Sequence, residues 1–195
     1  MKLMTSILSV AALSVAIAVP LMAQPAQSAP AAAKPAPARV SPSEITSTVI
    51  GGNRVTVAYS RPFTKDPKTG EARKIWGGLV PYGQVWRAGA NEATILVTQQ
   101  PIDFGGTSVP AGAYTLYMLP VENGASKLVI SKQLGQWGSQ YDEKQDLARV
   151  DLTKTATAGP MDQFTMAVVK DPAGGGAVTL AWENAQFSAP FTVKK

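Results

Sequence analysis

The stretch RVTVAYS, residues 54–60, decides the fold, because its apolar side chains recur at every second position. Val55, Val57 and Tyr59 fall on one face of an extended chain, since successive side chains of a β-strand point to opposite faces. A GGN sequence at residues 51–53 precedes the stretch, and glycine and asparagine adopt the positive φ angles of tight hairpin turns. The stretch therefore predicts one strand of an antiparallel sheet, entered through a hairpin.

The same alternation recurs along the chain after residue 40. It is seen in DLARVDLT (146–153), FTMAVV (164–169) and QFSAPFTV (186–193), whereas AYTLYML (113–119) is apolar on both faces, as in a central strand. Glycine-rich and Asn-Gly turns separate these runs. About nine or ten strands at this spacing predict an all-β domain, a single antiparallel β-sandwich, with a closed β-barrel as the alternative. We expect no helix beyond a turn or two near residues 143–147.

The N-terminal residues differ in composition from this domain. Residues 1–23, MKLMTSILSVAALSVAIAVPLMA, contain one lysine, an apolar stretch and then small residues, which is the layout of a secretory signal peptide. An uncleaved membrane anchor is the alternative, since residues 3–23 are just long enough to span a bilayer. Residues 24–39, QPAQSAPAAAKPAPAR, are typical of an extended tether. We therefore expect a signal peptide over 1–28, a linker over 29–40 and a β-sandwich domain over 41–195.

Charge and cysteine content restrict the compartment and the partners. The net charge of +5 arises from 18 basic and 13 acidic residues, and no run of Lys or Arg forms the stripe expected for nucleic acid. An exported chain without cysteine is typical of a bacterial envelope rather than of a disulfide-rich secretory route. We expect a periplasmic or secreted protein that binds no nucleic acid and is not inserted in a membrane after signal cleavage. The oligomeric state stays open.

The composition also excludes several chemistries. Without cysteine there are no disulfides, thiolate metal sites or cysteine nucleophiles, and without histidine there is no Ser-His-Asp triad and no imidazole metal site. An enzyme would have to use carboxylates, Lys, Tyr, Ser or Arg, with Lys74 and Tyr82 as possible bases. The acidic residues Asp142, Glu143 and Asp146 lack the order of a calcium loop, and we interpret them as a solvated face. We assign no catalytic residue, no metal ligand and no cofactor.

The segment KIWGGLVPYGQVWRAGANEAT, residues 74–94, fits neither a strand nor a helix. Loops of this length inside a compact domain are usually functional. Trp76, Trp86 and Trp137 stand beside glycines or in loop-like sequence, where an indole can present its flat face to a sugar ring or a peptide. In the alternative interpretation these rings cap the ends of the sandwich core.

Polar residues in and near this segment suggest a cluster of guanidinium and carboxylate groups. We expect Arg87 and Glu92 to pair with each other or with Arg61, as a brace that holds the loop to the sheet. In the alternative interpretation, Arg61 and Arg87 bind an anionic ligand. The predicted ligand-binding residues are Arg61, Trp76, Tyr82, Trp86, Arg87, Asn91, Glu92 and Trp137.

Four stretches carry a resemblance to a known family: YSRP (59–62), the 74–94 segment, VPAGAYTLYMLP (109–120) and WGSQYD (137–142). They resemble the signatures of DUF2911, a family of secreted bacterial domains of unknown function. The resemblance implies an exported β-rich domain and brings no activity with it.

Three functions remain open from the sequence. The leading hypothesis is an envelope domain that binds a small molecule, a glycan or a peptide through residues 74–94. The first alternative is a hydrolase or lyase that works without a metal, using carboxylates drawn from Glu92, Asp103, Asp142 and Glu183. The second alternative is a purely structural or interaction module.

Overall fold

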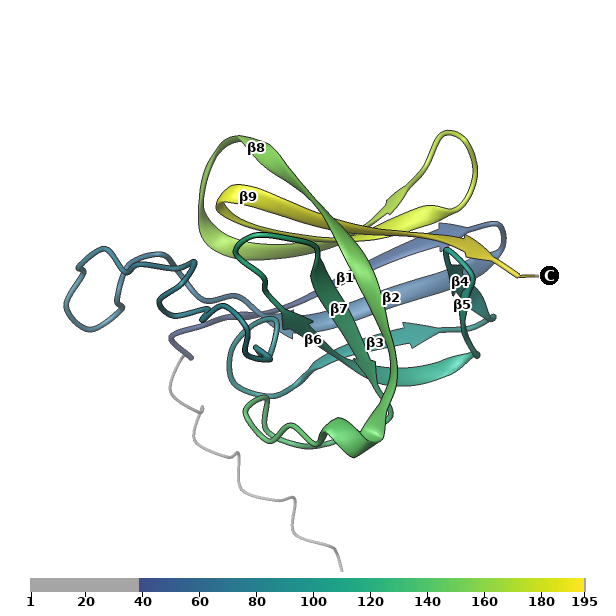
Figure 1. The fold of residues 1–195 in the computed structure, drawn as a ribbon, viewed down its shortest axis with the longest axis horizontal. Coiled ribbons are helices and arrows are strands. Elements are labelled where there is room, and N and C mark those ends of the chain that lie inside the picture. Colours follow the sequence, from purple (N-terminus) through teal and green to yellow (C-terminus); the bar gives the residue numbers. More distant parts are fainter. Residues whose placement is uncertain (1–38, 195) are drawn as a thin grey trace, which may run out of the picture. The chain divides into compact units, whose positions relative to one another are not determined.

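The computed structural model describes residues 39–194, which form the all-β fold that the sequence predicts (Figure 1). Within them, nine strands join antiparallel in the order β1-β2-β3-β6-β7-β8-β9-β4-β5, and β1 and β5 are the edges, so the sheet does not close into a barrel. The elements are β1 (Ser43–Ile50), β2 (Asn53–Ser60), β3 (Thr94–Thr98), β4 (Ile102–Phe104), β5 (Thr107–Val109), β6 (Gly112–Leu119), β7 (Ser126–Ser131), the 3-10 helix η1 (Glu143–Gln145), β8 (Asp146–Lys170) and β9 (Gly176–Val193).

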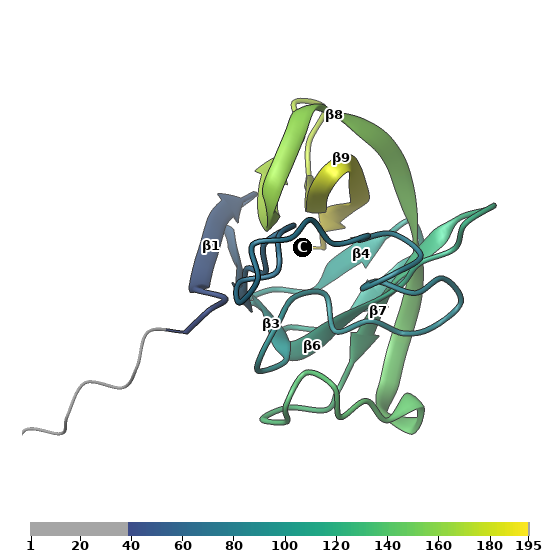
Figure 2. The same cartoon turned by 90° about the vertical axis from the view of Figure 1, so that its left-hand side faces the viewer.

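The sheet folds over on itself into two layers, because β8 belongs to both. Its first residues, 146–152, pair with β7, whereas its later residues, 153–170, pair with β9. Figures 1 and 2 show β8 and β9 lying over the layer that contains β1, β2, β3 and β6. The arrangement is sandwich-like, as predicted.

The core lies between these layers and follows the alternation seen in the sequence. Val55, Val57 and Tyr59 of β2 are buried, and Trp182 of β9 is completely enclosed. Buried side chains from β8 and β9 complete this part of the core: Phe164, Met166, Val168, Phe187, Ala189 and Phe191. The period-two pattern therefore identified the inward faces correctly.

One detail differs from the sequence prediction. The runs 146–153 and 164–169 were expected as separate short strands, but both belong to the single 25-residue strand β8. Its register against β9 shifts between Ala156 and Met161 and again between Met161 and Thr165. Irregularities of this kind bend a strand without ending it, so β8 continues as one strand along its pairing with β9.

Hairpin and helix predictions agree with the structure. Gly51 and Gly52 have φ angles of 56° and 83° and join β1 to β2. The short helix η1 begins after Asp142, whose carboxylate accepts a hydrogen bond from the Lys144 amide, and it lies where a turn or two was expected. Within residues 39–194 no helix has the length and apolar character needed to cross a membrane. The predicted signal peptide, 1–28, lies outside the described residues, as does all of the predicted linker except residues 39–40.

The long connection between β2 and β3, residues 61–93, lies against three other parts of the domain. Isolated backbone bridges join Phe63 to Gln163 of β8, Trp86 to Met118 of β6, and Glu92 to Trp137. Residues 64–73 form a small hairpin, which extends to one side of the domain in Figure 1. The connection is therefore an ordered wall, and it shapes the cavity described next.

Candidate functional site

A cavity of about 460 Å³ lies beside the 74–94 segment. Its wall combines Ser41, Pro62 and Arg73 with residues from 79–91, Tyr117 of β6 and residues 138–141. These parts are far apart in the sequence and meet only in the folded domain.

Trp86 and Arg87 are adjacent in the chain, but the ring of Trp86 packs in the core whereas the side chain of Arg87 lines the cavity. Trp86 exchanges backbone hydrogen bonds of 2.7 and 2.8 Å with Met118. Its ring is 8% exposed, stacks on Trp182 at 5.9 Å and meets the edge of Phe164 at 5.1 Å. Because neighbouring side chains of an extended chain point to opposite sides, Arg87 is directed away from the core and lines the cavity.

The turn after Arg87 has an unusual backbone. Ala88 and Asn91 have φ angles of 47° and 60°, in the left-handed region that L-residues other than Asn and Asp rarely adopt. Three hydrogen bonds hold the turn: the Thr94 hydroxyl donates to the Ala88 carbonyl (2.8 Å), the Gly138 amide donates to the Asn91 carbonyl (2.9 Å), and the Asn91 side-chain amide donates to the Ser41 carbonyl (3.1 Å). Strain of this kind is often found at ligand sites.

Gly138 allows the two loops that form the wall to approach closely. A Cβ at this position would lie 2.8 Å from Cδ of Arg87 and 2.9 Å from the Asn91 carbonyl oxygen. Only a residue without a side chain leaves this contact unchanged. The stem of Arg87 is consequently packed against residue 138, which restricts where its guanidinium can lie.

The charge of the lining is of one sign. Arg73 and Arg87 contribute cations, and no Asp or Glu belongs to the lining. Among the described residues, Arg87 forms no ion pair and its guanidinium makes no hydrogen bond, whereas Arg73 donates from Nη2 to the Phe63 carbonyl. The Nε of Arg73 is buried without a hydrogen-bond partner. The charged side chains of the lining are therefore cations only.

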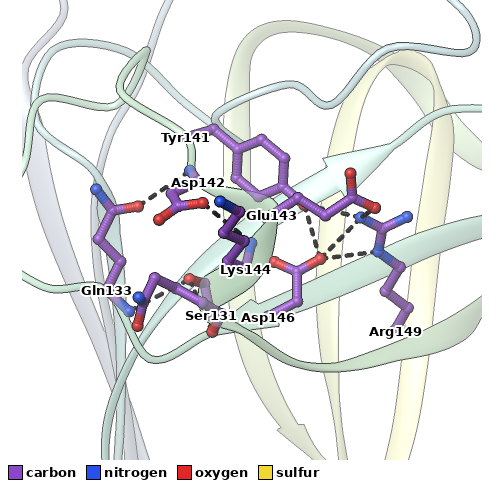
Figure 3. Close-up of polar contacts among 9 residues, drawn as sticks. Ser131, Gln133, Tyr141, Asp142, Glu143, Lys144, Asp146 and Arg149 are labelled. Carbon is purple, nitrogen blue, oxygen red and sulfur yellow. Dashed lines mark hydrogen bonds and ion pairs between the residues drawn. The ribbon is translucent and has the colours of Figure 1, made fainter.

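Two tyrosines pack together in the wall of the cavity, and of these Tyr117 is buried and Tyr141 is partly exposed. The rings of Tyr117 and Tyr141 meet edge to face at 4.8 Å. The Tyr141 hydroxyl donates to Asp146 (2.7 Å) and accepts from Nη2 of Arg149 (2.8 Å), as Figure 3 shows. Burial, followed by the hydrogen bond to Asp146, raises the pKa of Tyr141 to about 12. Tyr141 is therefore a neutral, fixed ring at physiological pH.

The acidic residues near η1 support this arrangement. Arg149 donates to Asp146 at 2.9 Å and to Glu143 at 2.7 Å, and Asp142 caps the helix (Figure 3). Within residues 39–194 no group of three or more acidic side chains has the arrangement of a metal site.

Comparison with known proteins identifies the family. The family model described as "Protein of unknown function (DUF2911)" matches residues 41–191. The chain belongs to the DUF2911 family. No curated protein and no solved structure matches it.

Each of the DUF2911 stretches recognised in the sequence contributes to the cavity. Pro62 ends YSRP, residues 79–91 lie in the long central segment, Tyr117 lies in VPAGAYTLYMLP, and residues 138–141 lie in WGSQYD. The cavity is thus where the family's separate sequence stretches converge.

Of the predicted ligand-binding residues, Trp86, Arg87 and Asn91 line the cavity, and the others lie elsewhere. Arg61 is a structural brace: its guanidinium donates to the Phe164 carbonyl (3.1 Å), to Glu44 (2.5 Å) and to the Thr165 hydroxyl (2.7 Å). It therefore ties the end of β2 to β1 and β8.

The predicted pairing of Arg87 and Glu92 with each other or with Arg61 is wrong. Glu92 pairs with Arg39, and both side chains are about half exposed. The hydrogen bond from Arg39 lowers the pKa of Glu92. The turn at residues 88–91 explains the difference, because its positive φ angles redirect the chain and leave Glu92 outside the cavity that Arg87 lines.

The other aromatic candidates mostly support the fold. Trp76 packs on the core, with its ring 5.0 Å from that of Phe187, so core capping describes both Trp76 and Trp86. Tyr82 lies against Gly77, where an added Cβ would be 2.9 Å from the ring. Trp137 is 45% exposed and lies outside the lining, although its backbone pairs with Glu92.

Sequence reasoning missed Arg73, Tyr117 and Tyr141 as lining residues. Tyr117 lies in AYTLYML, whose second apolar face is partly explained by the packing of Tyr117 against Tyr141. Tyr141 lies in WGSQYD, a stretch already singled out for its family resemblance. Arg73 had no comparable signal.

Proposed function

We propose that this protein binds a small molecule in the cavity between residues 79–91 and residues 138–141. The observation that carries the proposal is the convergence of all four DUF2911 stretches on one cavity. Its volume of about 460 Å³ lies within the range of about 300–1,000 Å³ usual for small-molecule sites.

The state of the wall supports a preformed site. The turn at residues 88–91 keeps a strained backbone, and three side-chain and backbone hydrogen bonds hold it in place. A wall that is already ordered reduces the entropy lost on binding.

The cavity favours a small molecule over the extended glycan or peptide considered from the sequence. A binding surface for a polymer would be expected to expose a row of aromatic faces, but Trp86 and Trp76 are packed in or against the core. The aromatic surface that the cavity offers comes mainly from Tyr141, since Tyr117 and Trp86 are both buried.

The lining gives little support to hydrolysis by paired carboxylates. No acidic residue belongs to it. Three of the four candidates are engaged separately: Glu92 with Arg39, Asp103 with Lys194 and the Gly106 amide, and Asp142 with the start of η1. The fourth, Glu183, whose pKa is raised by burial, lies outside the lining. Binding is therefore the better supported function. The signal peptide expected over residues 1–28 supports placing this binding outside the cytoplasm.

A screen with a blocked cavity tests the proposal. Ser139 is exposed and lines the cavity, so Ser139→Trp should fill it without disturbing the core. Ser108→Trp is the matched control, since Ser108 is exposed on β5 and lies outside the lining. Ligand-observed NMR with a fragment library should give hits that disappear in Ser139→Trp and persist in Ser108→Trp. Hits that survive Ser139→Trp, or a screen without hits, would refute the proposal.

A further inference from the structure

We propose that the ligand is a small carboxylate with a flat apolar body, whose carboxylate is bound by Arg87 and Arg73. The inference rests on the proposed function and adds the chemical class of the ligand. It follows from the charges of the lining, the unpaired guanidinium of Arg87 and the apolar side chains that face the cavity.

Arg87 is the primary anion-binding group. Its guanidinium has neither an ion pair nor a hydrogen bond among the described residues, although four other arginines, Arg39, Arg61, Arg73 and Arg149, are engaged with side chains or carbonyls. The aliphatic stem of Arg87 packs against Gly138, since a Cβ placed on that glycine would lie 2.8 Å from Cδ of Arg87. A cation that is positioned but not neutralised is suited to bidentate capture of a carboxylate.

Arg73 adds a second cation to the lining. Its Nη2 donates to the Phe63 carbonyl, which fixes one side of the guanidinium, while Nε is buried without an acceptor. Because Nε is enclosed, Arg73 acts on a ligand through the charge of its guanidinium, which forms no ion pair among the described residues. With no acid in the lining, nothing in the wall neutralises the two arginines.

The remainder of the lining determines the body of the ligand. Leu79, Pro81 and Val85 provide apolar contacts, and Tyr141, which packs on the buried Tyr117, provides ring surface. The Tyr141 hydroxyl is already occupied by Asp146 and Arg149, which leaves its ring as an uncharged surface. A flat body against these residues and a carboxylate at the arginines matches both halves of the cavity.

The test compares matched probes that differ only in charge. Isothermal titration calorimetry would measure phenylacetate against phenylacetamide and indole-3-acetate against indole-3-acetamide, with phenyl phosphate as a second anion. We expect each carboxylate to bind at least about tenfold more tightly than its amide, with the preference falling as ionic strength rises, since salt screens charge interactions.

Two variants assign this preference to the cavity. Arg87→Gln should weaken carboxylate binding at least about tenfold and change amide binding less than about twofold. Arg54→Gln is the control, because Arg54 is exposed on β2, outside the lining, and the substitution makes the same change of charge. It should leave all affinities unchanged.

The outcomes separate the two proposals. If amides bind as tightly as carboxylates and Ser139→Trp abolishes both, the cavity binds small molecules but the carboxylate inference is wrong. The inference is also wrong if Arg87→Gln has no effect, or if phenyl phosphate binds at least about tenfold more tightly than the carboxylates. If none of the probes binds, the carboxylate inference falls, and the fragment screen then decides whether the binding function falls with it.

Discussion

Gly138 offers a direct test of how tightly the cavity wall is assembled. In Gly138→Ala, the new methyl group would lie 2.8 Å from Cδ of Arg87, a side chain that can move, and 2.9 Å from the Asn91 carbonyl oxygen, which belongs to the backbone. Real Cβ atoms do not approach so closely, so the loop of residues 87–91 or the loop of residues 137–139 must shift. The shift would disturb the 2.9 Å hydrogen bond from the Gly138 amide to Asn91.

The magnitude follows from three contributions. Overpacking a well-packed site costs about 1–3 kcal/mol, and weakening one hydrogen bond costs about 0.5–1.5 kcal/mol. The smaller entropy of the unfolded chain offsets about 0.4–1 kcal/mol when alanine replaces glycine. Gly138→Ala should therefore lower the free energy of unfolding by about 0.5–4 kcal/mol, and it should weaken the binding of any ligand that contacts Arg87.

Urea denaturation followed by tryptophan fluorescence measures this change. Gly159→Ala is the control, because Gly159 is exposed in β8, has no atom within 4 Å of its Cβ position and does not adopt a positive φ. It should be neutral or stabilising by up to about 1 kcal/mol. If the two variants have the same stability within about 0.5 kcal/mol, the close approach of the two loops does not exist as described.

Two further predictions concern side chains outside the cavity lining and the titration of Tyr141. Arg61→Met should lower the free energy of unfolding by about 1.5–3 kcal/mol, because it removes a half-buried side chain that donates to three acceptors. Glu92→Gln should leave the stability in urea nearly unchanged, because the ion pair of Glu92 with Arg39 is exposed. Equal losses of stability in the two variants would contradict this contrast. Since folding raises the pKa of Tyr141 from 10.0 to about 12, the folded state holds this proton more tightly. The stability that this proton contributes should be complete below pH 10 and be lost as the pH rises toward 12. In urea melts between pH 9 and 11.5, Tyr141→Phe should therefore lose less stability than the unsubstituted protein. An identical loss in both proteins would contradict the assignment.

The inward faces of the strands could be predicted from the sequence because they depend on local geometry. Side chains in a strand alternate, so Val55, Val57 and Tyr59 had to share a face whichever strand lay beside them. The turn at Gly51 and Gly52 was predictable for a similar reason, since glycine tolerates the positive φ angles found there. The family was recognisable because its sequence stretches are continuous.

The path of β8 was harder to predict from the sequence. Its two apolar runs looked like separate strands, since residues 154–163 between them lack clear alternation. Pairing with β9 keeps this part extended despite the register shifts at Ala156 and Met161. Partners remote in sequence decide whether such a stretch ends a strand or bends it.

The candidate site shows the same division. The 74–94 segment was identified from its length and composition, but the side chains that line the cavity depend on backbone angles that the sequence did not reveal. The positive φ angles of Ala88 and Asn91 separate Arg87 from Glu92, although the five-residue spacing between the two side chains in the sequence suggested that they pair. Glu92 instead pairs with Arg39, and the stem of Arg87 packs against Gly138.

The sequence thus determined which residues face inward along each strand and which family the chain belongs to, because both depend on short continuous stretches. Only the tertiary structure decided which charges are paired and which are left facing the cavity, because that depends on loops brought together across the fold.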